Sequence, residues 1–285
     1  MEVKPIVSVV MITYGHEKYI EESINGVFLQ QTDFPVELII ANDCSPDNTD
    51  DAINRIMINA PETITVKYTR HENNLGIMPN FIWALEQAQG KYVALCEGDD
   101  YWTDNRKLQR QVDFLELDLS FSLSSENSKV IDERNELEYF FSNYESSREF
   151  SIEEILKGRK FHTASVLFRK NALRLPKNTS EFPFGDTLLF VNLALKGKIH
   201  YNPVNSSVYR RNVGGVSNDN NRLKWAKNVE RFNLLINDLL EHKYTSITNK
   251  SIAMNYYSAT KWAIKNFKLR EVFIATFNYL KYYFK

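Results

Sequence analysis

Three carboxylates crowd into one short turn, Glu97-Gly98-Asp99-Asp100, directly after an apolar run at residues 92–96 that is typical of a buried strand. Carboxylates this close repel one another unless a cation neutralises them. Mg²⁺ and Mn²⁺ prefer oxygen ligands and also bind the phosphates of a substrate. Because Asp and Gly are common turn residues, a solvent-exposed acidic turn is the alternative. The turn therefore predicts either a divalent-metal site or a solvated loop.

The residues before this turn alternate short apolar runs with longer helical patterns. We expect strands at residues 7–13, 36–41, 64–68 and 92–96, separated by helices at about 18–30, 50–59 and 78–89. Such alternation is the pattern of βαβ units that feed a parallel sheet. The fold class expected is therefore α/β, Rossmann-like, with a mostly parallel sheet flanked by helices.

Each of these strands ends in a polar segment that is able to bind a ligand. The four segments are Thr13-Tyr14-Gly15, Asn42-Asp43, residues 70–74 and residues 97–100. In open α/β sheets ligands lie outside the carboxyl ends of the strands, so the four segments should converge on one cleft. This convergence favours the metal site over the solvated loop.

The pattern is less regular after residue 104. We expect a helix at about 106–117, strands at 119–125, 129–132 and 164–169, and a mobile flap or insertion at 133–150. A helix at about 184–195 and an extended segment at 200–209 precede a flexible loop at 210–221. Everything from residue 222 has a helical pattern. We therefore predict a catalytic domain over residues 1–221 and a helical C-terminal extension over 222–285.

Composition excludes several classes of protein. With 43% hydrophobic and 25% charged residues the chain can bury a full core, and its net charge of -1 argues against nucleic acid as a partner. Cys44 and Cys96 are not in a Cys-x-x-Cys pair, so neither a disulfide framework nor a zinc site is expected. No signal peptide or bilayer-spanning stretch is expected either. These features favour a cytoplasmic protein.

The motifs together resemble the inverting, metal-dependent family 2 glycosyltransferases, which have the nucleotide-sugar-binding GT-A fold. Residues 7–14 resemble the family's first strand, which ends in a Thr-Tyr pair, although Ile12 stands where Pro is usual and Gly15 where Asn is usual. Residues 42–49, NDCSPDNT, are similar to the family's DDGS-x-DNT loop. Glu97-Gly98-Asp99 stands where the D-x-D metal motif stands, with Glu in the first position. The similarity extends over about residues 7–217.

The resemblance implies a UDP-sugar donor, held by Thr13, Tyr14, Asp43, Arg70, Asn80 and Glu97. Tyr14 would stack on the base, whereas its alternative is a rim aromatic that packs on the next helix. Asp43 would accept the imide N–H of uracil, a group that cytosine and adenine lack, unless it only forms an Asx turn.

For the metal, the resemblance implies that Asp99 binds Mn²⁺ or Mg²⁺, while Glu97 touches the ribose or reaches the ion through water. Asp100 would either support the metal site from behind Asp99 or contact the sugar, and Trp102 would contact the sugar or the acceptor. For Trp102, packing in the core remains the alternative.

Asp186 matches the position of the family's catalytic base, which deprotonates the acceptor hydroxyl; a helix N-cap is its structural alternative. The segment 209–217 resembles a late family loop that often carries a His near the position of Asn212. Because that residue is Asn here, Arg210 and Arg211 are left as clamps for the diphosphate, and water completes the metal's coordination.

Residues 261–285 combine many aromatic side chains with six Lys and Arg residues and a single opposing Glu271. This pattern suits an amphipathic helix at an anionic membrane surface, where each basic residue contributes about 1 kcal/mol. The alternative is a helix that packs on the catalytic domain or on another subunit of an oligomer.

The function expected is that of an inverting, metal-assisted hexosyl- or N-acetylhexosaminyl-transferase of polysaccharide biosynthesis. It would act on a glycan or lipid-linked acceptor in the cytoplasm, with peripheral contact at the inner face of the cell membrane. A catalytically silent relative that binds nucleotide or glycan is one alternative. A nucleotidyltransferase is another, although residues 13–17 lack the Gly-rich basic loop that binds a triphosphate.

Overall fold

The computed structural model describes residues 4–176, 179, 184–212 and 221–285. Contacts within the chain divide it into two compact units. The first comprises Met1–Ser151, Lys160–Arg174 and Asn192–Asn212, and the second comprises Ile152–Arg159, Leu175–Val191 and Val213–Lys285. The expected domains, 1–221 and 222–285, stay a prediction. The compact units have different bounds, because the second unit also contains two segments that precede residue 222.

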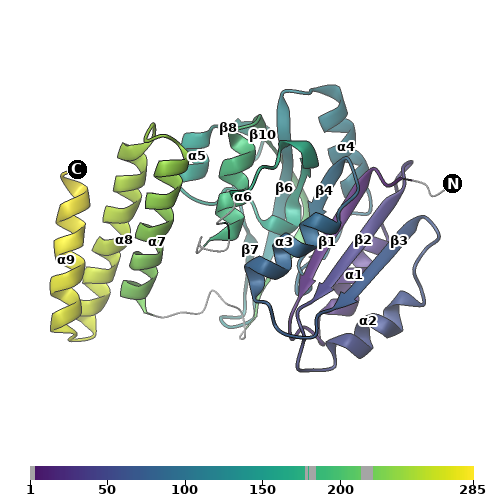
Figure 1. Cartoon of the computed structure of the whole chain (residues 1–285), viewed down its shortest axis with the longest axis horizontal. Helices are drawn as coiled ribbons and strands as arrows, with labels where there is room; N and C mark the ends of the chain where they lie inside the picture. The colour runs from purple at the N-terminus through teal and green to yellow at the C-terminus, as the bar shows by residue number, and fades with distance from the viewer. Residues whose placement is uncertain (1–3, 177–178, 180–183, 213–220) are drawn as a thin grey trace. The chain divides into compact units, whose positions relative to one another are not determined.

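The first unit is built on a sheet whose four N-terminal strands are parallel. Strands β1 (Val7–Thr13), β2 (Val36–Asn42), β3 (Ile64–Arg70) and β4 (Tyr92–Leu95) lie in the order β3-β2-β1-β4 (Figure 1). Each strand is separated from the next by a helix, which the parallel connection requires. The expected βαβ pattern is confirmed for this half of the sheet.

The second half of the sheet is mixed. β9 (Val166–Arg169) runs antiparallel between β4 and β6 (Phe121–Asp132). β10 (Lys198–Arg211) is parallel to β6, and β5 (Tyr101–Trp102) pairs antiparallel with β10. Short 3₁₀ turns at Thr163–Ser165 and Lys170–Ala172 flank β9. The α/β class is confirmed, with a sheet that is mixed on this side.

Three expectations about this region were wrong. Residues 121–132 form one strand, because Glu126 and Asn127 are buried within it and do not interrupt it. The expected flap holds β7 (Leu137–Phe140), paired with β6, and β8 (Arg148–Phe150), paired with β10. β10 continues to Arg211, so the loop expected from residue 210 begins later, and residues 213–220 lie outside the described residues.

The largest apolar cluster of the first unit lies on one face of the sheet, and alternate strand residues such as Val10 and Ile39 are buried on the other. Helices α1 (Ile20–Phe28), α2 (Thr49–Met57) and α4 (Lys107–Leu117) share one apolar cluster with alternate residues of β1 and β2. Helix α3 (Ile77–Gln87) contacts β1 and β2 as well. Successive side chains of a strand point to opposite faces of the sheet. Because both faces of these strands are covered, their sequences are near-continuous apolar runs.

The second unit is helical where it is described. It contains α5 (Ile152–Leu156), most of α6 (Gly185–Ala194), and the helices α7 (Arg222–Leu239), α8 (Thr245–Lys265) and α9 (Leu269–Tyr283). The side chain of Asn221 accepts hydrogen bonds from the amides of Leu223 and Lys224, which caps α7. An apolar cluster joins α7, α8 and α9, and Glu230 accepts hydrogen bonds from the hydroxyls of Tyr256 and Tyr282 at its edge.

Candidate active site

The carboxyl ends of the first four strands meet at one edge of the sheet. Thr13 is the register partner of Asn42, and Asn42 is the partner of Arg70. The backbone ladder continues past the strand ends, since the amide of Asp43 donates to the oxygen of Thr13 at 2.9 Å. The amide of Gly98 likewise donates to the oxygen of Ile12 at 2.9 Å. The predicted convergence of the four polar loops is confirmed.

Tyr14 and Asp43 lie at adjacent strand ends. The Tyr14 side chain is 48% exposed, so its ring is accessible to a ligand. Asp43 is buried, and its two oxygens accept the backbone amides of Leu75 at 2.7 Å and Gly76 at 2.9 Å. Gly76 adopts a φ of 88°, a conformation that L side chains rarely adopt, just before α3. A carboxylate oxygen can accept more than one hydrogen bond, so Asp43 retains capacity for a further donor.

Arg70 is the last residue of β3 and Asn80 lies in the first turn of α3, so the two residues are on either side of the loop that joins these elements. Arg70 is exposed, and its guanidinium approaches the backbone oxygen of Ser45 at 3.4 Å. Asn80 is buried, donates to the oxygen of Ala41 at 3.0 Å and contacts the ring of His71 at 2.9 Å. The burial of Asn80 favours a role in holding the loop; contact with the nucleotide stays a prediction.

Three consecutive amides of the first loop are held by side chains of the second. Gly15 donates to the hydroxyl of Ser45 at 3.0 Å and His16 to that of Thr49 at 2.9 Å. Glu17 donates to a carboxylate oxygen of Asp47 at 3.1 Å. The side chains that the DDGS-x-DNT-like loop provides therefore fix the backbone of the loop after β1.

The acidic turn packs tightly on that fixed loop at Gly98. A Cβ added to Gly98 would lie 2.5 Å from Oγ1 of Thr13 and 3.0 Å from Nδ1 of His16. The carbonyl of Gly98 also accepts the hydroxyl of Ser23 at 3.0 Å. Only a residue without a side chain fits between the two flanking acidic residues without displacing its neighbours.

Asp99 lies between side chains from two distant segments. Its Oδ2 accepts the amide of Asn212 at 2.9 Å and lies 3.7 Å from Nε2 of His16. The other ring nitrogen of His16, Nδ1, is 3.1 Å from Oγ1 of Thr13. The end of β10 and the loop after β1 therefore both reach the same carboxylate oxygen.

Asp100 is buried, and β10 holds it. Its Oδ1 accepts the backbone amide of Arg210 at 2.9 Å, and its Oδ2 lies 3.5 Å from Nδ1 of His162. Burial, followed by the nearby charges of Asp99 and Glu97, raises the pKa of Asp100 well above its usual value. The inaccessible carboxylate favours a positioning role, and contact with sugar or acceptor stays a prediction.

Arg210 and Arg211 are both engaged by the protein. The guanidinium of Arg210 donates to the backbone oxygen of Asp99 at 2.9 Å and forms an ion pair with Glu22. It also lies over the rings of Tyr19 and Tyr101, at 5.1 and 4.4 Å from their centroids. Arg211 pairs with Asp132 at 3.0 Å and reaches the hydroxyl of Tyr139 at 3.2 Å. Their role as diphosphate clamps stays a prediction.

Trp102 occupies the core behind the turn. Its ring is buried, its Nε1 donates to the oxygen of Ala164 at 2.7 Å, and Nζ of Lys107 lies 4.5 Å from its ring centroid. The backbone of Trp102 lies against α1, where a Cβ at Gly26 would be 2.8 Å from its nitrogen. This placement favours the packing alternative for Trp102, and a sugar contact stays a prediction.

Asp186 lies in the second compact unit, in the first turn of α6. Its Oδ1 accepts the amide of Thr187 at 2.7 Å, and its Oδ2 pairs with Nε of Arg159 at 3.2 Å. An N-cap side chain accepts an amide two or three residues on, whereas Thr187 is the next residue and Asp186 lies within α6. The side chain of Asp186 remains partly exposed. The role of Asp186 as catalytic base stays a prediction.

Sequence reasoning missed two residues of this site. The sequence patterns assign no role in the site to His16 or Glu22. His16 contacts Asp99, 83 residues further along the chain, and Glu22 contacts Arg210, 188 residues further along. The only signal for His16 was its place three residues after Thr13, at the end of the first strand.

The residues around Asp99 fit a divalent cation that binds together with a diphosphate. Among the described residues no three His, Cys, Asp or Glu side chains form a ligand group by themselves. Mg²⁺, however, is usually held by one or two carboxylates, with substrate phosphates and water as its other ligands. Burial is the largest cause of the raised pKa of Asp100, and the charges of Asp99 and Glu97 come next, so a cation would relieve the part that these charges contribute.

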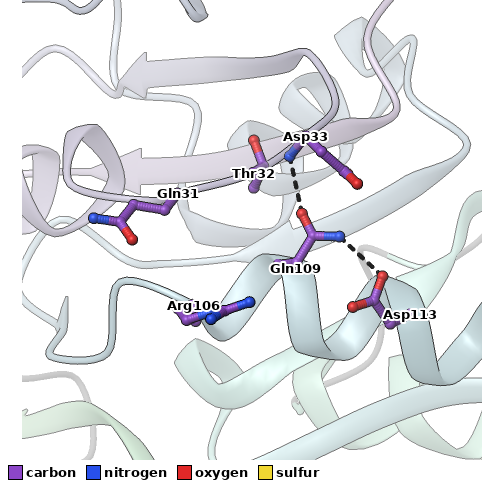
Figure 2. Close-up of a pocket in the computed structure, with 6 residues that line it drawn as sticks. All are labelled: Gln31, Thr32, Asp33, Arg106, Gln109 and Asp113. Carbon is purple, nitrogen blue, oxygen red and sulfur yellow. Dashed lines mark hydrogen bonds between the residues drawn. The ribbon is translucent and has the colours of Figure 1, made fainter.

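A separate surface depression is lined by Gln31, Thr32, Asp33, Arg106, Gln109 and Asp113 (Figure 2). Gln109 bridges it, because it accepts the amide of Asp33 and donates to Asp113, each at 2.9 Å (Figure 2). Residues 31–33 precede β2, so the depression lies at the amino end of that strand. It is therefore distinct from the strand-end loops that hold Asp43 and Asp99.

Comparison with known families and proteins adds to this geometry. The family described as "Glycosyl transferase family 2" matches residues 8–174. An uncharacterised protein of Mycobacterium tuberculosis is 35% identical over 211 residues, which cover 73% of this chain and 60% of that protein. A UDP-Glc:α-D-GlcNAc-diphosphoundecaprenol β-1,3-glucosyltransferase of Escherichia coli is 28% identical, over 74% of this chain and 80% of its own. The chain thus spans about 60% of the length of the mycobacterial relative.

Solved structures share the fold. S. aureus TarS in complex with UDP-GlcNAc superposes with a TM-score of 0.70 at 19% identity, over 97% of this chain and 81% of that one. A mannosyltransferase of Pyrobaculum calidifontis in complex with GDP-Man and Mn²⁺ gives a TM-score of 0.59 at 16% identity, over 98% and 88% of the two chains. The likeness to TarS confirms the expected GT-A fold.

Proposed function

The chain belongs to glycosyl transferase family 2, and from this premise we propose that it moves a sugar from a UDP-sugar to a hydroxyl group of a glycan or lipid-linked acceptor. The reaction inverts the anomeric carbon and is assisted by Mn²⁺ or Mg²⁺. The observation that carries the proposal is the meeting of Tyr14, Asp43 and Asp99 at the carboxyl edge of the parallel strands.

Recognition of the nucleotide falls to the first three strand-end loops. Tyr14 is exposed and stacks on the uracil, while Asp43 accepts its imide N–H. The two backbone amides that Asp43 accepts hold its carboxylate in one orientation, which favours selective binding. Thr13, Arg70, Asn80 and Glu97 complete the nucleotide site as supporting or contacting residues.

The diphosphate lies against the acidic turn in this proposal. Asp99 would hold the cation. Arg210 and Arg211 would supply further positive charge to the diphosphate. A bound divalent cation stabilises the negative charge that develops on the UDP leaving group. Since Arg210 donates to the backbone oxygen of Asp99, it also positions the turn that carries that carboxylate.

Asp186 acts as the base that accepts the proton of the acceptor hydroxyl. The attacking oxygen approaches the anomeric carbon from the face opposite UDP, which produces inversion. Arg159 pairs with one carboxylate oxygen of Asp186, so the base is held in place by a charge-assisted contact. Asp100 and Trp102 support the sugar and acceptor region, either by direct contact or through the core.

The test of this function is binding followed by turnover. Isothermal titration with UDP, GDP, CDP and ADP in the presence of Mn²⁺ should give the highest affinity for UDP. A panel of UDP-hexoses and UDP-N-acetylhexosamines should then release UDP when an acceptor is added. If none of the four nucleotides binds, the proposal is wrong.

A silent relative that only binds nucleotide or glycan remains the second candidate, because Glu97 departs from the D-x-D motif and Asn212 stands where the late loop often carries a His. The Asp186→Asn variant separates the two. We expect it to bind UDP as the wild type does and to lose at least about 100-fold in turnover. Undiminished turnover would remove Asp186 as the base, and inactivity of the wild type with every donor would favour the silent relative.

The acceptor class is proposed from chemistry and from relatives. The E. coli relative is named for a lipid diphosphate acceptor, which supports a lipid-linked glycan as the acceptor here. Such an acceptor belongs to polysaccharide biosynthesis and lies at the cytoplasmic face of a membrane. No helix in the described part of the chain is long and apolar enough to cross a bilayer.

Contact with that membrane is proposed for α9. Its exposed apolar side chains recur at helical spacing along one face: Leu269, Phe273, Phe277, Leu280 and Phe284. Lys265, Lys268, Arg270, Lys281 and Lys285 lie in or next to this helix; Lys268 is paired with Glu271, and Lys281 with Glu230. An apolar face with flanking positive charge is complementary to a surface of anionic lipids, so we assign this face to a bilayer.

A further inference from the structure

His16 is the one imidazole close to Asp99 among the described residues. Its Nε2 lies 3.7 Å from Oδ2 of Asp99, and Asn212 donates to the same oxygen at 2.9 Å. His16 belongs to the loop after β1, whereas Asn212 follows β10. Asp99 therefore lies between an imidazole from near the start of the first unit's sequence and a side-chain amide from near its end.

We infer that His16 is a ligand of the divalent cation held by Asp99, and that it supplies the imidazole that the late loop lacks. The inference rests on the proposed metal-assisted function and names the residue that completes its metal site. His16 and Asp99 would then be the protein ligands of the cation, and the donor's diphosphate would supply further oxygen ligands.

The separation of the two ligand atoms suits one ion. With metal–ligand bonds of about 2.1 Å, two atoms bound to the same ion lie about 3.0–4.2 Å apart, depending on the angle between them. The 3.7 Å between Nε2 of His16 and Oδ2 of Asp99 lies between these limits, so a shift of about 0.7 Å brings the atoms to the separation of neighbouring octahedral ligands. The two atoms need no large movement to share a cation.

The surroundings of His16 also match those of a metal-binding histidine. Such histidines use their second ring nitrogen for a hydrogen bond that fixes the ring, and Nδ1 of His16 lies 3.1 Å from Oγ1 of Thr13. When Nδ1 donates to that hydroxyl, the lone pair of Nε2 points toward Asp99. The backbone of His16 is held by Thr49, and Gly98 leaves just enough room for the ring.

His162 is the competing imidazole, because its Nδ1 lies 3.5 Å from Oδ2 of Asp100. That nitrogen, however, already accepts the amide of Ala164 at 3.3 Å, and the ring stacks on Tyr209 with 3.9 Å between centroids. His162 is thus bound into the core, whereas His16 is directed at the carboxylate that the metal needs.

The test is pulsed electron paramagnetic resonance of Mn²⁺ bound to the full chain with UDP. We expect the wild type to show nitrogen modulation from a histidine, which changes when the protein is labelled with ¹⁵N-histidine. His16→Gln should abolish the modulation and weaken Mn²⁺ binding about 10- to 100-fold. His162→Gln and the exposed His242→Gln should keep it.

His16→Asp distinguishes a ligand from a packing role, and it serves if His16→Gln fails to fold. An oxygen ligand at this place should restore Mn²⁺ affinity to within about 10-fold of the wild type without restoring the nitrogen modulation. Modulation that persists in a folded His16→Gln or His16→Asp protein, or its absence from a Mn²⁺-bound wild type, would overturn the inference and leave the proposed function standing. A wild type that binds no Mn²⁺ with UDP would overturn both.

Discussion

Gly98 is the residue on which the geometry of the acidic turn depends most directly. In Gly98→Ala the new methyl group would lie 2.5 Å from Oγ1 of Thr13, so the turn and the loop after β1 must separate. We expect Mn²⁺ and UDP affinity to fall about 10-fold or more, with a loss of about 1–3 kcal/mol in stability. Titration of both ligands and thermal unfolding measure the two effects.

Gly197→Ala is the matched control for this prediction. Its Cβ would meet backbone atoms of Ser120 and Ser122 at 2.8 Å, which is similar crowding at the start of β10, away from the strand-end loops. It should lose comparable stability and keep its ligand affinity. Equal loss of affinity in both variants would show that crowding anywhere in the first unit has this effect.

The sequence could identify the site residues that come directly after a predicted strand. Asp43 and Asp99 are of this kind, and both lie at the expected edge. His16 and Glu22 acquire their roles only from contacts with Asp99 and Arg210, which no local pattern encodes. Asp100 and Trp102 look accessible in sequence because the turn is polar, but β10 covers them.

At the scale of elements, β6 explains why the second half of the sheet was harder to predict. Polar residues in its middle suggested two strands, yet Glu126 is buried with both carboxylate oxygens paired to Arg110, at 2.6 and 3.0 Å. Bidentate pairing satisfies a charge that sequence hydropathy counts as exposed. β7 and β8 depend on pairing with β6 and β10, so their sequences alone resemble an irregular insertion.

β10 and α4 together make the first unit sensitive to acid. His200 of β10 stacks on Phe114 of α4 with 3.6 Å between centroids, and burial lowers the pKa of His200 to about 4. Between pH 6.5 and 4 the unfolded chain therefore binds a proton that the folded chain does not. The free energy of unfolding should fall by about 2 kcal/mol from this residue between pH 7 and pH 5.

His200→Phe tests that prediction, because it keeps the aromatic contact and removes the titrating group. Chemical denaturation at the two pH values should show a smaller acid-side loss in the variant than in the wild type. The exposed His242, in the second unit, provides the control, and His242→Gln should leave the wild-type difference unchanged. A variant as acid-sensitive as the wild type would remove His200 as the cause.

At the scale of the whole molecule, the membrane contact proposed for α9 has a direct test. We expect the protein to sediment with vesicles rich in phosphatidylglycerol and to remain free with phosphatidylcholine alone. Raised salt should weaken the binding, because flanking cations contribute about 1 kcal/mol each near an anionic surface. Phe273→Ser with Phe277→Ser should reduce binding at least about 10-fold by removing buried apolar area.

Ile58→Ser is the control for surface hydrophobicity, since Ile58 is exposed in the first unit. It should bind vesicles as the wild type does. Equal binding to neutral and anionic vesicles would contradict the charge argument. If light scattering shows instead a dimer that the Phe273 and Phe277 changes dissociate, a second copy of the chain covers this face.

The three amides of Gly15, His16 and Glu17 offer a way to watch the site in solution. Each donates to a side chain of the loop after β2, so each N–H resonance reports whether the two loops remain in register. A ligand that draws His16 toward Asp99 would move all three resonances together, while one that binds only at Tyr14 would spare Glu17. In a ¹⁵N-labelled protein the backbone thus provides its own spectroscopic readout, which distinguishes nucleotide entry from cation capture.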